Sequence, residues 1–196
     1  SLSKSFEIVI PVYHKQIPLA YVLLGDVNEK KIEMSAAIKH LPYIQTLTNI
    51  IVVSIENKKL YRQTIQKAQI QKELELAQTM QQMLFPEKLP NTEMIKVAAK
   101  YIPHQQVSGD YYDFLPLNIH EFMFCVADVS GKGISAALLM SNFQANLRAI
   151  IKYTDFSLPK LIEELNTSVI NSAKGERFIT LFIARYNIIT RKLKYI

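Results

Sequence analysis

The sequence has a single cysteine, Cys125, and no apolar run long enough to span a bilayer. One cysteine cannot form a disulfide within the chain, and its place inside an apolar stretch fits a reducing compartment. We therefore expect a cytoplasmic protein with no membrane segment in this chain. The chain begins at Ser1 rather than at an initiator methionine, so attachment to a membrane through upstream sequence stays open.

A strong excess of one charge is also absent. The net charge is +6 over 196 residues, of which 20% are charged. The basic residues between Lys58 and Lys72 follow a helical pattern, which is typical of a solvated helix face rather than of a nucleic-acid platform. We predict no nucleic-acid partner. An apolar fraction of 49% is enough for a buried core and indicates a globular chain.

Glycine is scarce too, and three of the five glycines fall between Val107 and Gly133. Within this stretch, residues 122–127 are uniformly apolar, which predicts a strand buried on both faces. Residues 111–117 are a plausible antiparallel partner strand, and residues 118–120 are a plausible connection. A hairpin in register about Ile119 would place Asp110 directly opposite Asp128.

Two opposed carboxylates repel each other, because directly opposed side chains of an antiparallel pair lie only about 5 Å apart. A divalent cation such as Mg²⁺ or Mn²⁺ is the simplest compensation, since such ions prefer oxygen ligands. The alternative from spacing alone is two solvated aspartates at the end of a hairpin. Asp113 would face the other side of its strand and is predicted to be structural. His104 and His120 lie in loops without a partner ligand, and we expect them to be solvated or capping.

A nucleotide site is a second possibility for the same stretch. Residues 131–136, Gly-Lys-Gly-Ile-Ser-Ala, match a dinucleotide fingerprint whose last position is alanine. A Rossmann unit would continue from its helix into a parallel strand. Here a helix pattern over 134–152 is followed by a second one over 158–173, which argues against nucleotide binding.

Several ordered motifs resemble one family. They are Ser-Gly-Asp-Tyr-Tyr-Asp-Phe at 108–114, Ala-Asp-Val-Ser-Gly-Lys-Gly at 127–133, Leu-Glu-Leu-Ala-Gln-Thr-Met-Gln-Gln-Met-Leu-Phe-Pro at 74–86, and Arg-Phe-Ile-Thr-Leu-Phe at 177–182. Together they resemble the PPM-type (protein phosphatase 2C-like) metal-dependent serine/threonine phosphatases, in the bacterial RsbU/SpoIIE branch.

This resemblance implies an α+β fold, a partial αββα sandwich. It also implies two Mn²⁺ or Mg²⁺ ions that activate a water to hydrolyse phosphoserine or phosphothreonine. By motif match, Asp110 and Asp128 would be the catalytic, metal-binding carboxylates, and Val129 would offer its backbone carbonyl to the metal. Gly109 would allow close backbone approach.

The preceding residues divide into two further parts. Residues 6–12 and 19–24 read as two strands and, with the turns around them up to residue 40, weakly resemble the end of a GAF or PAS-type sensor domain. Residues 41–86 form the linker region. Its helix is predicted over 38–84, and the apolar spacing along it predicts a coiled-coil homodimer. By family resemblance, residues 66–84 would transmit an upstream signal. Pro86 and Pro90 would end the helix.

The phosphatase domain is expected over 87–196, beginning with a strand at 94–102 and reaching strands at 178–186 and 192–196. Family members continue with further metal-binding aspartates, so we expect this stretch to be the N-terminal part of the domain and to be inactive alone. The resemblance implies a phosphoprotein substrate, commonly a STAS-type anti-sigma-factor antagonist. The competing hypothesis is a dimeric signalling linker whose degenerate phosphatase domain only binds a partner.

Overall fold

The computed structural model describes residues 8–14, 17–24, 34–103, 106–153 and 157–196. The chain divides into two compact units, residues 1–70 and 71–196, and each is described by itself. His104 lies outside the described residues.

The first unit contains an antiparallel hairpin of β1 (Ile8–His14) and β2 (Ile17–Leu24). It also contains most of α1 (Met34–Gln82), a helix of 49 residues that continues through Pro42. The helix prediction is therefore confirmed, with its ends within a few residues of the expected positions. Many apolar side chains along α1 are exposed, among them Leu47, Ile51 and Ile65. Among the described residues, no helix is both long and apolar enough to cross a membrane.

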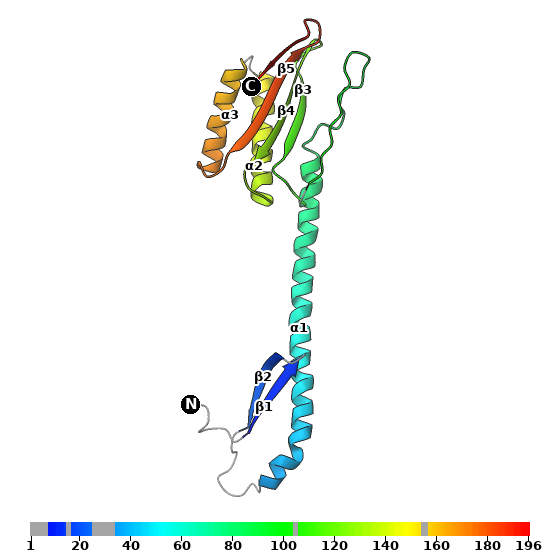
Figure 1. Cartoon of the computed structure of the whole chain (residues 1–196), viewed down its shortest axis with the longest axis vertical. Helices are drawn as coiled ribbons and strands as arrows, with labels where there is room; N and C mark the ends of the chain where they lie inside the picture. The colour runs from blue at the N-terminus through cyan, green and yellow to red at the C-terminus, as the bar shows by residue number, and fades with distance from the viewer. Residues whose placement is uncertain (1–7, 15–16, 25–33, 104–105, 154–156) are drawn as a thin grey trace. The chain divides into compact units, whose positions relative to one another are not determined.

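The second unit is built on a four-stranded antiparallel sheet in the order β3-β4-β5-β6. Its strands are β3 (Tyr111–Pro116), β4 (Glu121–Val129), β5 (Ile179–Asn187) and β6 (Lys192–Tyr195). Two helices, α2 (Ile134–Tyr153) and α3 (Leu158–Ala173), lie against one face of this sheet (Figure 1). The mixture of helices with an antiparallel sheet confirms the α+β class.

The core lies between the sheet and the two helices, because every second residue of β3 and β4 points that way. Met123, Cys125 and Ala127 of β4 are buried there against Met140 and Leu147 of α2. The helix α3 begins with Pro159 in its first turn, where the missing amide donor costs nothing. It ends at Lys174 in the left-handed conformation, followed by Gly175, which is also left-handed.

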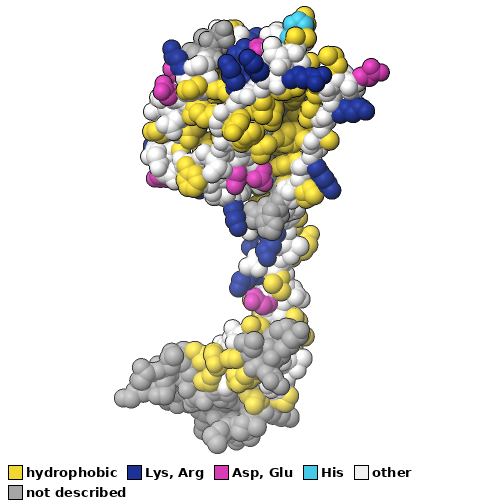
Figure 2. All heavy atoms as spheres, turned by 45° about the horizontal axis from the view of Figure 1, so that its top comes forward, with side chains coloured by type: hydrophobic (Ala, Val, Ile, Leu, Met, Phe, Trp, Pro, Cys, Tyr) yellow, Lys and Arg dark blue, Asp and Glu magenta, His cyan; other side chains and the backbone are white. Residues whose placement is uncertain are grey.

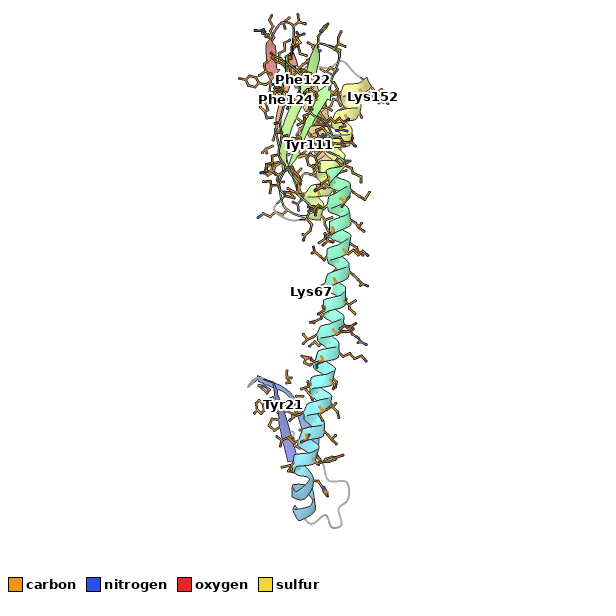
Figure 3. All side chains as sticks on the ribbon, turned by 90° about the vertical axis from the view of Figure 1, so that its right-hand side faces the viewer. Tyr21, Lys67, Tyr111, Phe122, Phe124 and Lys152 are labelled. Atoms are coloured by element: carbon orange, nitrogen blue, oxygen red, sulfur yellow. The ribbon has the colours of Figure 1, made fainter. Side chains whose placement is uncertain are left out.

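The opposite face of the sheet is only partly covered. Phe122 and Phe124 project from β4 (Figure 3), and Phe122 packs on Phe114 with a centroid separation of 4.8 Å. Val126, two residues farther along, is 58% exposed, and Phe182 beside it is 42% exposed. Hydrophobic side chains gather on one side of this unit in Figure 2. The prediction that the strand over 122–127 is buried on both faces is thus wrong at Val126.

The strand predicted over 94–102 is also wrong. This segment has only an isolated bridge between Asn91 and Lys96, and no other described strand pairs with it. Apolar side chains of this segment are therefore not covered by a sheet, and those of Met94 and Ile102 are exposed. Alternation alone does not make a strand, because the backbone groups also need a neighbour to bond. A second sheet of a sandwich, a coiled coil and a sensor-domain remnant remain predictions.

Candidate active site

Asp110 and Asp128 occupy opposed positions on neighbouring strands. The hairpin of β3 and β4 pairs Tyr111 with Ala127 and continues to Pro116 with Phe122, which is the predicted register about Ile119. The pairing extends one step beyond the strand, since the Val129 amide donates to the Gly109 carbonyl at 3.3 Å. Asp110 and Asp128 lie between these two contacts. Both residues are exposed, and the register confirms the prediction that Asp110 lies opposite Asp128 at this end of the hairpin.

Ser108 holds the Asp110 carboxylate. The Ser108 hydroxyl donates to Asp110 Oδ2 at 2.9 Å, and the Asp110 amide donates to the Ser108 hydroxyl oxygen at 3.2 Å. On the partner strand, the Thr180 hydroxyl donates to the Asp128 carbonyl at 3.3 Å. The Asp110 carboxylate itself is therefore hydrogen-bonded, whereas Asp128 is bonded through its backbone carbonyl.

Gly109 lies against the backbone of Val129. A Cβ added at Gly109 would come within 2.8 Å of the Val129 carbonyl oxygen and 3.0 Å of Val129 Cβ. Only glycine permits this approach, as expected from the motif. The Val129 carbonyl thus lies beside the segment that carries Asp110.

The glycine loop after β4 bends sharply around an arginine. Gly131 and Gly133 have φ of 99° and 71°, which are left-handed values that favour glycine. The Arg177 side chain lies where a Gly131 Cβ would be and donates to the Ser130 carbonyl at 2.7 Å. The Ser130 hydroxyl accepts from the Phe178 amide at 2.9 Å. The two residues before β5 therefore hold the loop in place.

These segments enclose a cavity of about 400 Å³. Its lining residues are Val107, Ser108, Gly109, Asp110, Asp128, Gly131, Lys132 and Gly133. Two carboxylates fit a Mg²⁺ or Mn²⁺ ion, which is commonly held by one or two carboxylates and completes its shell with water and substrate phosphate. No cluster of three metal-ligating side chains occurs in the part of the chain that the structure describes.

Asp113 lies in the core rather than at the candidate metal site. Its side chain is fully buried and accepts hydrogen bonds from Arg148 of α2, at 2.8 Å from Nε and 3.0 Å from Nη2. The Tyr111 hydroxyl and the Phe114 amide also donate to it. The predicted structural role of Asp113 is consistent with this network, which joins β3 to α2.

Burial raises the pKa of two tyrosines and of the cysteine in this unit. Burial raises the pKa of the Tyr101 phenol, and the nearby charge of Asp110 adds to this. Burial also raises the pKa of Tyr111 above its usual value, and the hydrogen bond to Asp113 adds to it. Burial raises the pKa of the Cys125 thiol to about 12. Because the thiol is protonated and only 1% exposed, Cys125 is no nucleophile here.

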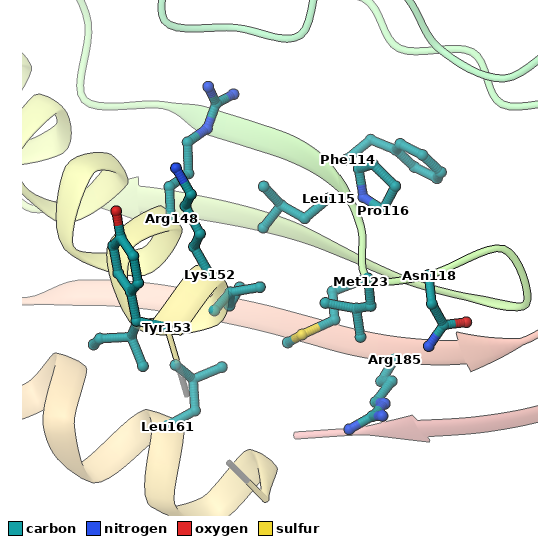
Figure 4. Close-up of a pocket in the computed structure, with 13 residues that line it drawn as sticks. Phe114, Leu115, Pro116, Asn118, Met123, Arg148, Lys152, Tyr153, Leu161 and Arg185 are labelled. Atoms are coloured by element: carbon teal, nitrogen blue, oxygen red, sulfur yellow. The ribbon is translucent and has the colours of Figure 1, made fainter. Parts of the chain in front are cut away.

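A second cavity, of about 860 Å³, lies near the hairpin end of β3 and β4 (Figure 4). It contains Arg148, Lys152 and Arg185, but both arginines are engaged with carboxylates. Arg148 pairs with Asp113, and Arg185 Nη2 lies 2.6 Å from a Glu121 oxygen. Among the described residues that line this cavity, none carries a carboxylate, a thiol or an imidazole.

Sequence reasoning missed three residues around the site, namely Gln81, Ser108 and Arg177. Gln81 lies in the last turn of α1 and bonds to Ser108, 27 residues away. All three residues belong to the matched motifs, but no local pattern indicated their partners. His120, in the hairpin turn, is exposed as expected.

Comparisons with known proteins match part of the chain. Residues 119–196 match the model of a family described as Stage II sporulation protein E (SpoIIE). Phosphoserine phosphatase RsbU of Bacillus subtilis (strain 168) is 36% identical over 134 residues, which cover 65% of this chain and 37% of RsbU. Phosphoserine phosphatase RsbP of the same organism is 24% identical over 134 residues, which cover 66% of this chain and 33% of RsbP. The chain thus spans about a third of the length of these two relatives.

Among solved structures, the chain is similar to a Mycobacterium tuberculosis protein whose crystal structure is described as that of its RsbU and RsbW domains. The identity is 21% and the TM-score 0.42, over 48% of this chain and 26% of the other. The family match and the identity to RsbU agree with the motifs quoted above. Residues 119–196 thus match the SpoIIE family, and the identity to RsbU supports the RsbU/SpoIIE branch of the PPM-type phosphatases.

Proposed function

We propose that this protein is a signal-regulated phosphatase that removes phosphate from serine or threonine of a partner protein. The observation that supports the proposal is the register of β3 and β4, in which Asp110 lies opposite Asp128 at the exposed end of the hairpin. Two relatives named phosphoserine phosphatases support it. The partner's identity follows only from family resemblance, which favours a STAS-type anti-sigma-factor antagonist.

In this proposal, Asp110 and Asp128 bind Mn²⁺ or Mg²⁺ through their carboxylates, and Val129 contributes its backbone carbonyl. A bound divalent ion would supply an activated water and would offset negative charge on the phosphoryl oxygens. The Ser108 hydroxyl keeps one oxygen of Asp110 oriented. Lys132 lines the same cavity, and its ammonium suits a phosphate dianion.

Two metal ions are implied by the family, and a second ion would need more carboxylates than these two. The described residues offer no cluster of three ligating side chains. We therefore expect residues 1–196 alone to show little turnover. The activity is proposed for the protein in the full form that its gene encodes.

We further propose that the protein is a homodimer paired along α1. Leu47, Ile51 and Ile65 of this helix are exposed and lie on one face at heptad spacing. Burying such side chains against a second copy would contribute about 25 cal/mol per Å² of apolar surface. Polar residues between them, such as Ser54 and Lys58, would keep the pairing weak enough to respond to a signal.

The test is manganese-dependent release of phosphate from a phosphoserine peptide and from p-nitrophenyl phosphate by the full gene product, beside its Asp128→Asn variant. We expect turnover by the wild type and its loss in the variant. A folded wild-type protein that binds a partner but releases no phosphate with manganese would favour the competing hypothesis of a degenerate, partner-binding domain.

A further inference from the structure

The ladder between β4 and β5 changes at its last step, where the chain enters the glycine loop, residues 131–133. The ladder runs up to the pair of Val129 and Ile179. At the next step, the Ser130 amide donates to the Phe178 carbonyl at 2.9 Å, as in a regular antiparallel pair. The Phe178 amide donates to the Ser130 hydroxyl at 2.9 Å, where a regular pair would use the Ser130 carbonyl. The side chain of Ser130 thus takes the place of its carbonyl in the ladder.

The Ser130 carbonyl bonds to Arg177 instead. Arg177 Nη1 donates to this oxygen at 2.7 Å. The guanidinium also packs on Gly131, because a Cβ added there would overlap Nη1 and come within 2.7 Å of Cζ. Gly131 has a φ of 99°, so the chain leaves the strand direction at this residue. Arg177 therefore packs on the bend and bonds to the carbonyl at which the bend begins.

This bond decides between two arrangements of the loop. Without the guanidinium, the Ser130 carbonyl would lose its donor, which is costly at a partly buried position. The Phe178 amide is the donor that an antiparallel pair would supply to this carbonyl. That bond would complete the ladder and rotate the peptide between Ser130 and Gly131. The loop beyond this peptide, which carries Lys132, would move with it.

The rotation would affect the parts of the cavity differently. The Val129 carbonyl and the Ser130 amide belong to one planar peptide, and that amide is bonded to the Phe178 carbonyl. This peptide is therefore held independently of Arg177. Lys132 lies beyond the bend and lines the cavity. Loss of the guanidinium should thus displace the ammonium that suits a phosphate while the Val129 carbonyl stays in place.

We propose that Arg177 is a positioning residue for the substrate phosphate: it keeps the glycine loop bent, and the bend places Lys132 at the cavity. This inference rests on the proposed function, because it requires that the cavity beside Asp110 and Asp128 receives the phosphate of the substrate. Arg177 is not among the described residues that line the cavity, so it acts through the loop.

A second arginine provides a matched control. Arg185 of β5 donates from Nη2 to a Glu121 oxygen at 2.6 Å. It ties β5 to β4 through the same kind of side chain, but at the end of the strand opposite to Asp128. If Arg177 only fastens these two strands together, both arginines should behave alike.

The experiment measures the binding of inorganic phosphate by titration calorimetry, on the full gene product with saturating Mg²⁺. Arg177→Met keeps much of the side-chain volume and removes the donor. We expect it to weaken phosphate binding by about 10- to 100-fold, since a misplacement of about 1 Å can cost a site that much. A separate titration with Mn²⁺, without phosphate, should give the wild-type affinity. Arg185→Met should keep both affinities, although each variant lowers the melting temperature.

A double variant tests whether Arg177 acts through Lys132. Lys132→Met should itself weaken phosphate binding. Adding Arg177→Met should then cause little further loss, because the ammonium that Arg177 positions is already gone. A further loss as large as that of Arg177→Met alone would contradict the proposal, because Arg177 would then act on phosphate independently of Lys132.

Three other results would overturn the positioning role. They are wild-type phosphate affinity in Arg177→Met, an equal loss in Arg185→Met, and a parallel loss of Mn²⁺ affinity in Arg177→Met. A wild-type protein that binds Mn²⁺ but no phosphate would refute this inference alone. A wild-type protein that binds neither would instead refute the proposed function, and this inference with it.

If Arg177→Met does not fold, Ser130→Ala provides the test. This variant removes the hydroxyl acceptor of the Phe178 amide, so that amide should bond to the Ser130 carbonyl in competition with Arg177. Weaker phosphate binding with unchanged Mn²⁺ affinity is expected here too. Unchanged phosphate binding in Ser130→Ala would show that the shape of the loop does not set the phosphate site.

Discussion

Replacing Arg148 by methionine should destabilise the second unit by about 3 kcal/mol. Removing one partner of a buried ion pair costs about 3–5 kcal/mol, because the remaining charge is left uncompensated. Asp113 is fully buried, whereas the Arg148 side chain is 41% exposed. The lower end of the range applies because Tyr111 and the Phe114 amide still donate to the carboxylate after the substitution.

The coupling between the two residues gives a sharper number. Asp113→Asn leaves the Arg148 guanidinium free to turn towards water. This substitution should therefore lower the free energy of unfolding by only about 1–2 kcal/mol, the value of a hydrogen bond to a charged group. On that background Arg148→Met should cost about 1 kcal/mol, since no buried charge remains. The coupling energy of the pair is then about 2 kcal/mol.

Urea denaturation followed by circular dichroism measures these values, because the helices and sheet of this unit share one core. Lys152→Met is the matched control, one turn farther along α2 on an exposed side chain, and it should stay within about 0.5 kcal/mol of wild type. An Arg148→Met variant as stable as the Lys152→Met control would refute the assignment of Asp113 and Arg148 as a structural pair.

Three further outcomes are expected. Gly109→Ala should lower the free energy of unfolding by about 1–3 kcal/mol and weaken manganese binding, because the added methyl group meets the Val129 carbonyl oxygen. An unchanged melting temperature together with unchanged manganese affinity would contradict the close approach of Gly109 to Val129. Cys125 should resist a thiol reagent at pH 8 until denaturant is added. Its pKa rises from an ordinary 9.0 to about 12 on folding, so the stability contributed by the neutral thiol is complete below pH 9 and is lost as the pH rises towards 12. Ile51→Glu should shift sedimentation from dimer towards monomer, whereas Lys67→Glu, on a charged exposed position, should have a smaller effect; monomeric wild type would refute pairing along α1.

Much of the second unit follows from local pattern. The hairpin register was predictable because a short polar connection joins two apolar runs of matching length, and it brings Asp110 and Asp128 together. The helix over 158–173 was predictable because proline and glycine mark its ends. A structural role for Asp113 was predictable because side chains alternate along a strand, which turns Asp113 away from the face of Asp110.

Contacts between distant segments were not predictable in the same way. The partners Arg148 and Asp113 are 35 residues apart, and Gln81 and Ser108 are 27 apart. Such bonds depend on how α1, α2 and β3 pack, and neither residue carries a local signature of its partner. The strand prediction over 94–102 was wrong for the same reason. The alternation of its residues is visible in the sequence, but the lack of a strand to pair with is not.

The most direct test of the central claim is the rate of phosphoserine peptide hydrolysis by the full gene product over a manganese titration, for the wild type, Asp110→Asn, Asp128→Asn and the double variant. If the opposed carboxylates hold metal as one unit, each single variant should lose about 100-fold or more, and the double variant should be little worse than either. Folded single variants that retain wild-type rates at every manganese concentration would contradict the account.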